Sequence, residues 1–167
     1  MRLLAISGSL REGSYNTALA RAAADVAPEN VEVELFDGLG ELPLFDADLE
    51  GDASPAVRHL RERIAAADAV LFVTPEYNGS IPGVLKNAVD WASRPRGDAE
   101  HAPEVLLRPE RSVLAGARAR VVCPDLPVGR AQDVCDPTGA PSPLVAERLR
   151  QHIGELLREA VPVAVAA

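Results

Sequence analysis

Aromatic residues are scarce in this 167-residue chain, which has one Trp, two Tyr and three Phe. Hydrophobic residues nevertheless make up 47% of the chain, so its core must be filled mainly by Ala, Val, Leu and Ile. No apolar run approaches the ~20 residues that a membrane-spanning helix needs. The first apolar run, 3–6, is too short for a secretory signal and is typical of a buried strand. We therefore expect a cytoplasmic protein without a membrane segment, whose length suits one domain over 1–167.

Positive charge is also in short supply. The chain has 17 Lys and Arg against 25 Asp and Glu, a formal net charge of −8, and Lys86 is its single lysine. Because no basic stripe runs along the sequence, we expect no nucleic-acid partner. The two cysteines, Cys123 and Cys135, form no CxxC pair and no Cys/His cluster at zinc spacing, and the acidic stretch 46–52 matches no calcium loop. We expect neither a metal site nor a disulfide in a cytoplasmic chain.

Strand-like and helix-like patterns alternate along the chain. Short apolar or alternating runs predict strands at 2–7, 31–36, 68–74 and 119–123. Capping residues and helical periodicity predict helices at 18–24, 54–64 and 82–91, and a last one from 142 onward. That last helix has an apolar stripe made of Leu144, Leu149, Ile153, Leu156 and Leu157. The alternation favours an α/β fold in which helices cover both faces of a parallel sheet.

The loop after the first strand, Ser7 to Thr17, is rich in small and hydroxyl-bearing residues. Small residues let the backbone N–H groups turn inward, and the N-terminus of the following helix adds a positive field. Arg11 adds a forked cation. The pattern is neither GxGxxG nor a Walker loop, and it predicts a cradle for a terminal phosphate. The alternative is a capped turn that binds nothing.

The loop after the third predicted strand, 74–83, enters the next helix through Pro82. Pro75 and Gly79 allow an irregular backbone with free N–H groups, and Tyr77 offers a flat apolar face. Such a loop can hold the edge of a planar heterocycle, although an ordinary loop with a buried Tyr has the same composition. In a doubly wound sheet both loops lie beyond the carboxyl ends of the strands, where ligands bind.

Two stretches, GSLREGSYNTAL at 8–19 and TPEYNGSIPGVLKNAVDWASRP at 74–95, closely resemble the NADPH-dependent FMN reductase family, which includes quinone, azo and chromate reductases. The resemblance covers 1–95 almost without a break and resumes loosely at about 113–160. It implies a flavodoxin-like fold and an enzyme that transfers hydride from NADPH through bound FMN to a flavin, quinone or similar small acceptor. It also implies a homodimer or homotetramer whose interface includes the helix 82–91.

The resemblance assigns the cofactor contacts residue by residue. The flavin phosphate would be held by Ser9, Arg11, Ser14, Tyr15, Asn16 and Thr17. The isoalloxazine ring would be lined by Pro75, Glu76, Tyr77, Asn78 and Gly79. No catalytic side chain is expected, because the flavin carries the redox chemistry and the protein positions it.

The segment 94–118 departs from the family pattern. Family members have a strand after the Asp-Trp helix, followed by a Ser/Gly-rich loop that contacts the flavin. Here the best strand candidate, 105–107, has three residues, and no Gly-Gly or Ser-Gly pair follows it. We therefore predict that a strand and its loop are deleted or replaced, which leaves the sheet one strand short or pairs the last strand with the third. Three alternatives follow: a weaker flavin site, a binding module, or an enzyme for another phosphorylated ligand.

Overall fold

The computed structural model describes residues 1–94, 104–106, 120–121, 126–136 and 138–160. Its sheet has five strands in the order β2-β1-β3-β4-β5, and every neighbouring pair is parallel. The strands are β1 Arg2–Ser7, β2 Glu32–Phe36, β3 Ala69–Val73, β4 Glu104–Leu106 and β5 Arg120–Val121. The chain runs outward from β1 to β2 and then crosses back to β3, so the sheet is doubly wound with its switch point between β1 and β3.

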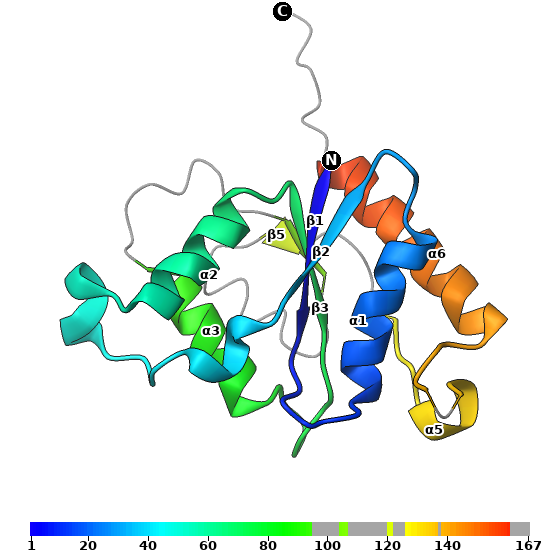
Figure 1. The fold of residues 1–167 in the computed structure, drawn as a ribbon, viewed down its shortest axis with the longest axis horizontal. Helices are drawn as coiled ribbons and strands as arrows, with labels where there is room; N and C mark the ends of the chain where they lie inside the picture. The colour runs from blue at the N-terminus through cyan, green and yellow to red at the C-terminus, as the bar shows by residue number, and fades with distance from the viewer. Residues whose placement is uncertain (95–103, 107–119, 122–125, 137, 161–167) are drawn as a thin grey trace, which may run out of the picture.

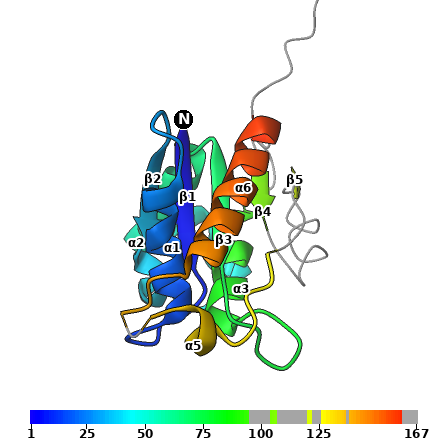
Figure 2. The same ribbon diagram turned by 90° about the vertical axis from the view of Figure 1, so that its right-hand side faces the viewer.

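Helices cover both faces of this sheet, as the sequence pattern predicts (Figures 1 and 2). On one face lie α1 Tyr15–Val26 and α6 Pro143–Ala160, and on the other lie α2 Pro55–Ala65 and α3 Gly83–Ala92. The short elements η1 Gly38–Glu41, η2 Ala47–Asp52 and α5 Ala131–Val134 lie in the connections. Alternate residues of β1 enter different cores: Leu3 packs with α1 and α6, whereas Leu4 and Ile6 pack with α2 and α3.

Local chemistry sets the helix boundaries where the sequence predicts them most clearly. The Ser54 hydroxyl accepts a bond from the Val57 N–H at 3.4 Å, and Pro55 occupies the first turn of α2. The apolar stripe predicted for α6 needs one correction, because Leu144 is 71% exposed and Val145 is buried instead. A helix rotates by 100° per residue, so a register error of one residue moves a side chain from core to solvent.

The prediction that the sheet is one strand short is wrong. Strand β4 pairs with β3 through Ala69↔Glu104, Val70↔Val105 and Leu71↔Leu106, and β5 pairs with β4 rather than with β3. Three residues suffice because backbone bonds to neighbours on both sides define a strand, whatever its side chains. The flavin loop expected to be missing falls within 107–119, outside the described residues. None of the described helices is long and apolar enough to cross a membrane.

Candidate functional site

The two loops singled out from the sequence meet at the carboxyl ends of β1 and β3. Ser7 and Val73 are paired in register, and the next residue, Gly8, donates its N–H to the Val73 carbonyl at 2.9 Å. A Cβ placed on Gly8 would lie 2.3 Å from Thr74 Oγ1 and 2.8 Å from its Cβ. Glycine is therefore needed here because the backbone of the first loop touches the first side chain of the second.

The N-terminus of α1 is left without a side-chain cap. Ser14 occupies the N-cap position with an extended backbone, yet its side chain makes no cap hydrogen bond, and it is only 5% exposed. The first intrahelical bond runs from the Ala18 N–H to the Ser14 carbonyl. The N–H groups of Tyr15, Asn16 and Thr17 thus have no intrahelical acceptor and point out of the helix, which is the arrangement that binds anions.

Hydroxyl groups and one cation surround this helix end. Thr17 Oγ1 lies 2.8 Å from Ser7 Oγ, and Ser9 Oγ accepts the Arg11 N–H at 3.3 Å. Arg11 is exposed, and within the described chain its guanidinium donates only a long 3.4 Å bond to the Glu12 carbonyl. Its charge therefore stays available to a ligand. Sequence reasoning missed Ser7 as a member of this group, because its bond to Thr17 depends on where α1 packs.

A tight two-residue turn lies in the middle of the second loop. The Tyr77 N–H donates to the Ser80 carbonyl at 2.8 Å and the Ser80 N–H returns the bond at 3.1 Å. Asn78 and Gly79 both have positive φ, 54° and 74°, which is the geometry of a type I′ turn and explains the Asn-Gly pair. Tyr77 is 55% exposed, so the expectation of a buried Tyr in this loop is wrong, whereas the role of the loop in holding a ligand stays a prediction.

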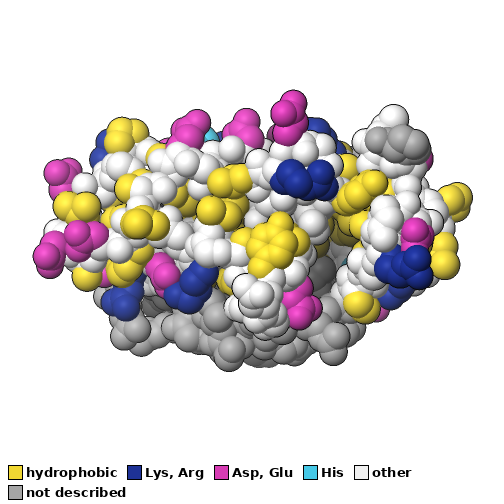
Figure 3. Space-filling view, turned by 90° about the horizontal axis from the view of Figure 1, so that it is seen from below, with side chains coloured by type: hydrophobic (Ala, Val, Ile, Leu, Met, Phe, Trp, Pro, Cys, Tyr) yellow, Lys and Arg dark blue, Asp and Glu magenta, His cyan; other side chains and the backbone are white. Residues whose placement is uncertain are grey.

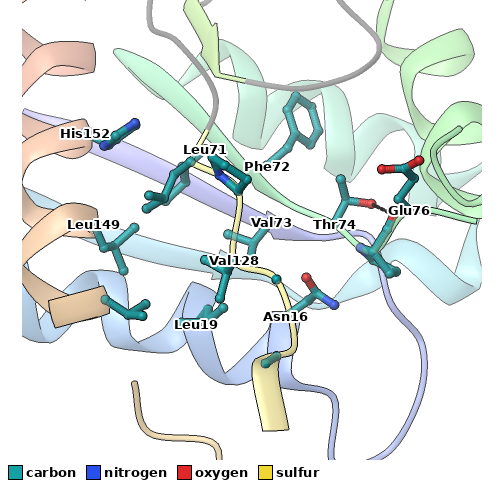
Figure 4. Close-up of a pocket in the computed structure, with 16 residues that line it drawn as sticks. Asn16, Leu19, Leu71, Phe72, Val73, Thr74, Glu76, Val128, Leu149 and His152 are labelled. Carbon is teal, nitrogen blue, oxygen red and sulfur yellow. Dashed lines mark hydrogen bonds between the residues drawn. The ribbon is translucent and has the colours of Figure 1, made fainter. Parts of the chain in front are cut away.

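A cavity of about 450 Å³ opens beside the end of β3 (Figure 4). The cavity is lined by Asn16 from the first turn of α1 and by Thr74, Pro75 and Glu76 from the second loop. The remaining walls are mostly apolar and come from α1, β3, α6 and the segment 126–131. Its volume and its few polar groups lie within the range of small-molecule sites. The other eight predicted cofactor contacts do not line this cavity: Ser9, Arg11, Ser14, Tyr15, Thr17, Tyr77, Asn78 and Gly79.

Sequence reasoning missed the contribution of 126–131 to this cavity. The signal that can find it is topological, since the segment follows the last strand at the same carboxyl edge of the sheet. A turn after α5 ties it to α1: Gly139 has φ +89°, and a Cβ there would lie 2.5 Å from the Ala18 Cβ. The Thr138 hydroxyl, with the N–H groups of Ala140 and Thr138, lowers the pKa of Asp136 and stabilises that turn.

Comparison with known proteins decides what the two loops belong to. The model of the NADPH-dependent FMN reductase family matches residues 1–119. The chain belongs to this family.

Several curated proteins resemble this member of the NADPH-dependent FMN reductase family over its N-terminal part. An NAD(P)H-dependent FMN reductase of Pseudomonas aeruginosa is 53% identical over 96 residues, which are 57% of this chain and 51% of the relative. A 2-hydroxy-1,4-benzoquinone reductase of a Burkholderia species is 46% identical over 99 residues, 59% of this chain and 54% of the relative. The Escherichia coli quinone reductase is 41% identical over 123 residues, 72% of this chain and 65% of the relative. The chain thus spans about half to two thirds of the length of the curated relatives it matches.

Solved structures match over nearly the whole chain. The flavoenzyme FerB, an NAD(P)H:(acceptor) oxidoreductase from Paracoccus denitrificans, has a TM-score of 0.75 and 27% identity, and the match covers 95% of this chain and 96% of that one. The apo form of the NADH:FMN oxidoreductase EmoB has a TM-score of 0.66 and 20% identity over 98% and 91%. The fold expected from the sequence, flavodoxin-like and doubly wound, is therefore confirmed.

The Asp-Trp helix of this FMN reductase family member holds the connection after η1. Both Trp91 Nε1 and Asn87 Nδ2 donate to the Pro43 carbonyl at 2.8 Å, and Asn87 Oδ1 accepts the Phe45 N–H at 2.7 Å. Phe45 packs edge-on against Trp91 with ring centroids 5.0 Å apart. Leu44 lies between these anchored residues and is 85% exposed.

Proposed function

We propose that this chain binds FMN and acts as an NAD(P)H-dependent oxidoreductase on quinone-like acceptors. The proposal rests on the contact between the loop 7–17, called the phosphate loop from here on, and the loop 74–80 at the switch point. The membership of this chain in the family adds to it. Gly8 and Thr74 join the two loops, so a ligand can reach both at once. We treat the residues 1–167 as one domain in this proposal.

The residues at the N-terminus of α1 fit the phosphate of FMN. Three first-turn N–H groups point outward without a capping side chain, and the Thr17 hydroxyl belongs to the same turn. Ser9 adds a further hydroxyl from the preceding loop. An exposed Arg11 adds a bidentate cation, which matches the geometry of a phosphate. Local donors are needed because the net charge of −8 disfavours an anionic ligand at long range.

The 74–80 loop supplies the groups for the ring. Pro75 and Glu76 face the cavity that Asn16 also lines, and Tyr77 presents an exposed aromatic face at the tip of the turn. When bound, FMN supplies two-electron redox chemistry between a nicotinamide and an acceptor. The protein's part is to hold the ring edge through this loop and to leave one ring face accessible.

We also propose a cytoplasmic homodimer whose interface includes the outer side of α3 and Leu44. The hydrogen bonds of Asn87 and Trp91 hold the backbone on both sides of Leu44, which lowers the backbone entropy lost when this segment enters an interface. The space-filling view of the carboxyl edge shows hydrophobic side chains scattered between acidic and basic ones (Figure 3). Sedimentation of the wild type and of Leu44→Asp tests the proposal: a dimer that the variant dissociates supports it, and a wild-type monomer contradicts it.

Titration of the purified apo-protein with FMN, followed by quenching of flavin fluorescence, tests the function. We expect micromolar or tighter binding, a yellow protein, and oxidation of NADPH or NADH in the presence of 1,4-benzoquinone. Absence of binding up to millimolar FMN overturns the proposal.

The departure of 94–118 from the family pattern favours a second candidate, a binding module or an enzyme for another phosphorylated ligand. Both alternatives keep the phosphate loop but dispense with the flavin ring. A protein that binds inorganic phosphate at the N-terminus of α1 but not FMN supports them. A protein with tight FMN binding and quinone reduction excludes them.

A further inference from the structure

Ser7 is a buried polar residue at the edge of the proposed site, and neither the family resemblance nor the cavity assigns it a role. In the described part of the chain, the buried polar residues are Ser7, which is 7% exposed, and Ser14. Its Oγ lies 2.8 Å from Thr17 Oγ1 and accepts the Ser9 N–H at 3.4 Å. Ser7 thus joins the end of β1 to the first turn of α1 through side chains.

The single hydrogen between Ser7 Oγ and Thr17 Oγ1 can belong to either residue. If Thr17 donates it, the Thr17 oxygen presents lone pairs to its surroundings, which repels an anion. If Ser7 donates it, the Thr17 hydrogen stays free to bond an anion's oxygen. Thr17 is in the first turn of α1, beside the outward N–H groups that attract anions. A bound phosphate therefore selects the second arrangement.

We propose that Ser7 is a positioning residue for a phosphate monoester: by donating to Thr17 Oγ1 it turns the Thr17 hydroxyl hydrogen toward the phosphate at the N-terminus of α1. Ser7 itself does not touch the ligand. The inference rests on the proposed function, because FMN is the phosphate ester that the site is proposed to hold.

The surrounding bonds make this direction self-consistent. The Ser9 N–H donates to Ser7 Oγ, Ser7 Oγ–H donates to Thr17 Oγ1, and Thr17 Oγ1–H is left to donate to the ligand. Each bond in such a series strengthens the next, because each oxygen that accepts becomes a better donor. The strand pairing of Ser7 with Val73 fixes the backbone of the residue in the middle of this series.

The test compares two ligands that share a ring but differ in the phosphate, FMN and riboflavin, on Ser7→Ala, Thr17→Val and the double variant. We expect Ser7→Ala to weaken FMN binding about fivefold, the value of one hydrogen bond, and to change riboflavin binding by less than about twofold. In the Thr17→Val background, Ser7→Ala should then weaken FMN binding by less than about twofold, because the group it positions is gone.

Several outcomes overturn the inference while leaving the proposed function intact. These are equal losses for FMN and riboflavin, unchanged FMN binding in Ser7→Ala, or additive losses in the double variant. Ser7→Cys keeps the shape of the side chain at a slightly larger size but donates weakly, so it should behave like Ser7→Ala if the hydrogen bond matters and like wild type if only the filling of space does. Thermal unfolding of each variant checks that it is folded.

A final arm separates this inference from the proposed function. If the wild type fails to bind FMN, the FMN titration is replaced by a titration with inorganic phosphate, followed by ³¹P line broadening. Phosphate binding that Ser7→Ala weakens then supports the inference although the proposed function fails. No phosphate binding to the wild type overturns both.

Discussion

The helices α1 and α2 both have a serine at the N-cap position, but only the serine of α2 makes a capping hydrogen bond. Ser14 and Ser54 both occupy N-cap positions with extended backbones, at φ −68°, ψ 126° and φ −59°, ψ 160°. Ser54 accepts the Val57 N–H and Pro55 removes one further donor, so the first turn of α2 has fewer free donors than that of α1. Ser14 makes no such bond.

The difference teaches which helix end is structural and which is open to a ligand. A helix end that caps itself contributes to stability whether or not anything binds. The end of α1 keeps its donors outward, and it lies where β1 and β3 present both loops. Variants that act on one end and not on the other can break or sharpen this comparison.

The largest effect is expected for Gly8→Ala, which pushes the first loop against Thr74. The added methyl group would lie 2.3 Å from Thr74 Oγ1 and 3.1 Å from a Leu85 methyl, so backbone and side chains must shift. We expect a loss of about 1–3 kcal/mol in the free energy of unfolding, measured by urea denaturation. The matched control is Gly51→Ala, whose methyl group meets nothing within 4 Å. Equal losses in both variants contradict the proposed contact between the loops.

A somewhat smaller effect on ligand affinity is expected for Arg11→Gln. Loss of a charged hydrogen bond to the phosphate should weaken FMN binding about tenfold or more, and the difference from wild type should shrink as salt is added. Arg21→Gln removes the same charge from an exposed position further along α1, and we expect less than about a twofold change. If both variants weaken FMN equally, the effect is one of net charge and Arg11 does not contact the ligand.

The two N-cap serines provide the direct comparison. Ser54→Ala should cost about 1 kcal/mol of folding free energy, because the Val57 N–H loses its acceptor. Ser14→Ala should cost less than about 0.5 kcal/mol, because no cap bond is lost, while FMN binding weakens about fivefold. Urea denaturation and FMN titration of both variants give the four values. A reversed order of stability losses contradicts the distinction between the two helix ends.

Much of this architecture can be predicted from local sequence chemistry. Ser54-Pro55 marks the start of α2 through bonds between near neighbours, and the alternation of elements predicts the parallel sheet. Strand β4 is harder to find, because three residues carry no periodicity and the strand is defined by its neighbours' backbones. Val145 rather than Leu144 is buried beneath α6, which depends on how that helix packs against the sheet.

The candidate site also has parts that local sequence predicts and parts that only tertiary packing sets. The loops 8–17 and 74–80 lie within contiguous motifs that a resemblance can recognise. Ser7 and Thr17 are ten residues apart and meet only because α1 returns across the end of β1. The segment 126–131 joins residues of α1, β3 and α6 in lining the cavity, although these elements are far apart in the sequence. These contacts are tertiary, so no pattern within a short window predicts them.

The smallest effect is a pH dependence of the turn beside α1. The Thr138 hydroxyl and backbone N–H groups bond the ionised Asp136 carboxylate and hold its pKa below the ordinary value of about 3.9. A group whose pKa is lower in the folded state stabilises the fold above its unfolded pKa, and that contribution is lost as pH falls through the folded value. We therefore expect stability from this group to be complete above about pH 4 and to decline below it.

Asp136→Asn tests this sign, because the amide keeps an acceptor oxygen but does not titrate. The difference in thermal midpoint between wild type and variant should be larger at pH 7 than at pH 3. Asp133→Asn serves as the control on the same segment: its carboxylate pairs with Arg130 at the surface. Exposed pairs contribute little, so its pH dependence should stay close to that of wild type. If the difference in thermal midpoint between wild type and Asp136→Asn does not change with pH, the ionised carboxylate has no stabilising role. Packing of Gly139 against Ala18 then holds the turn on α1 without it.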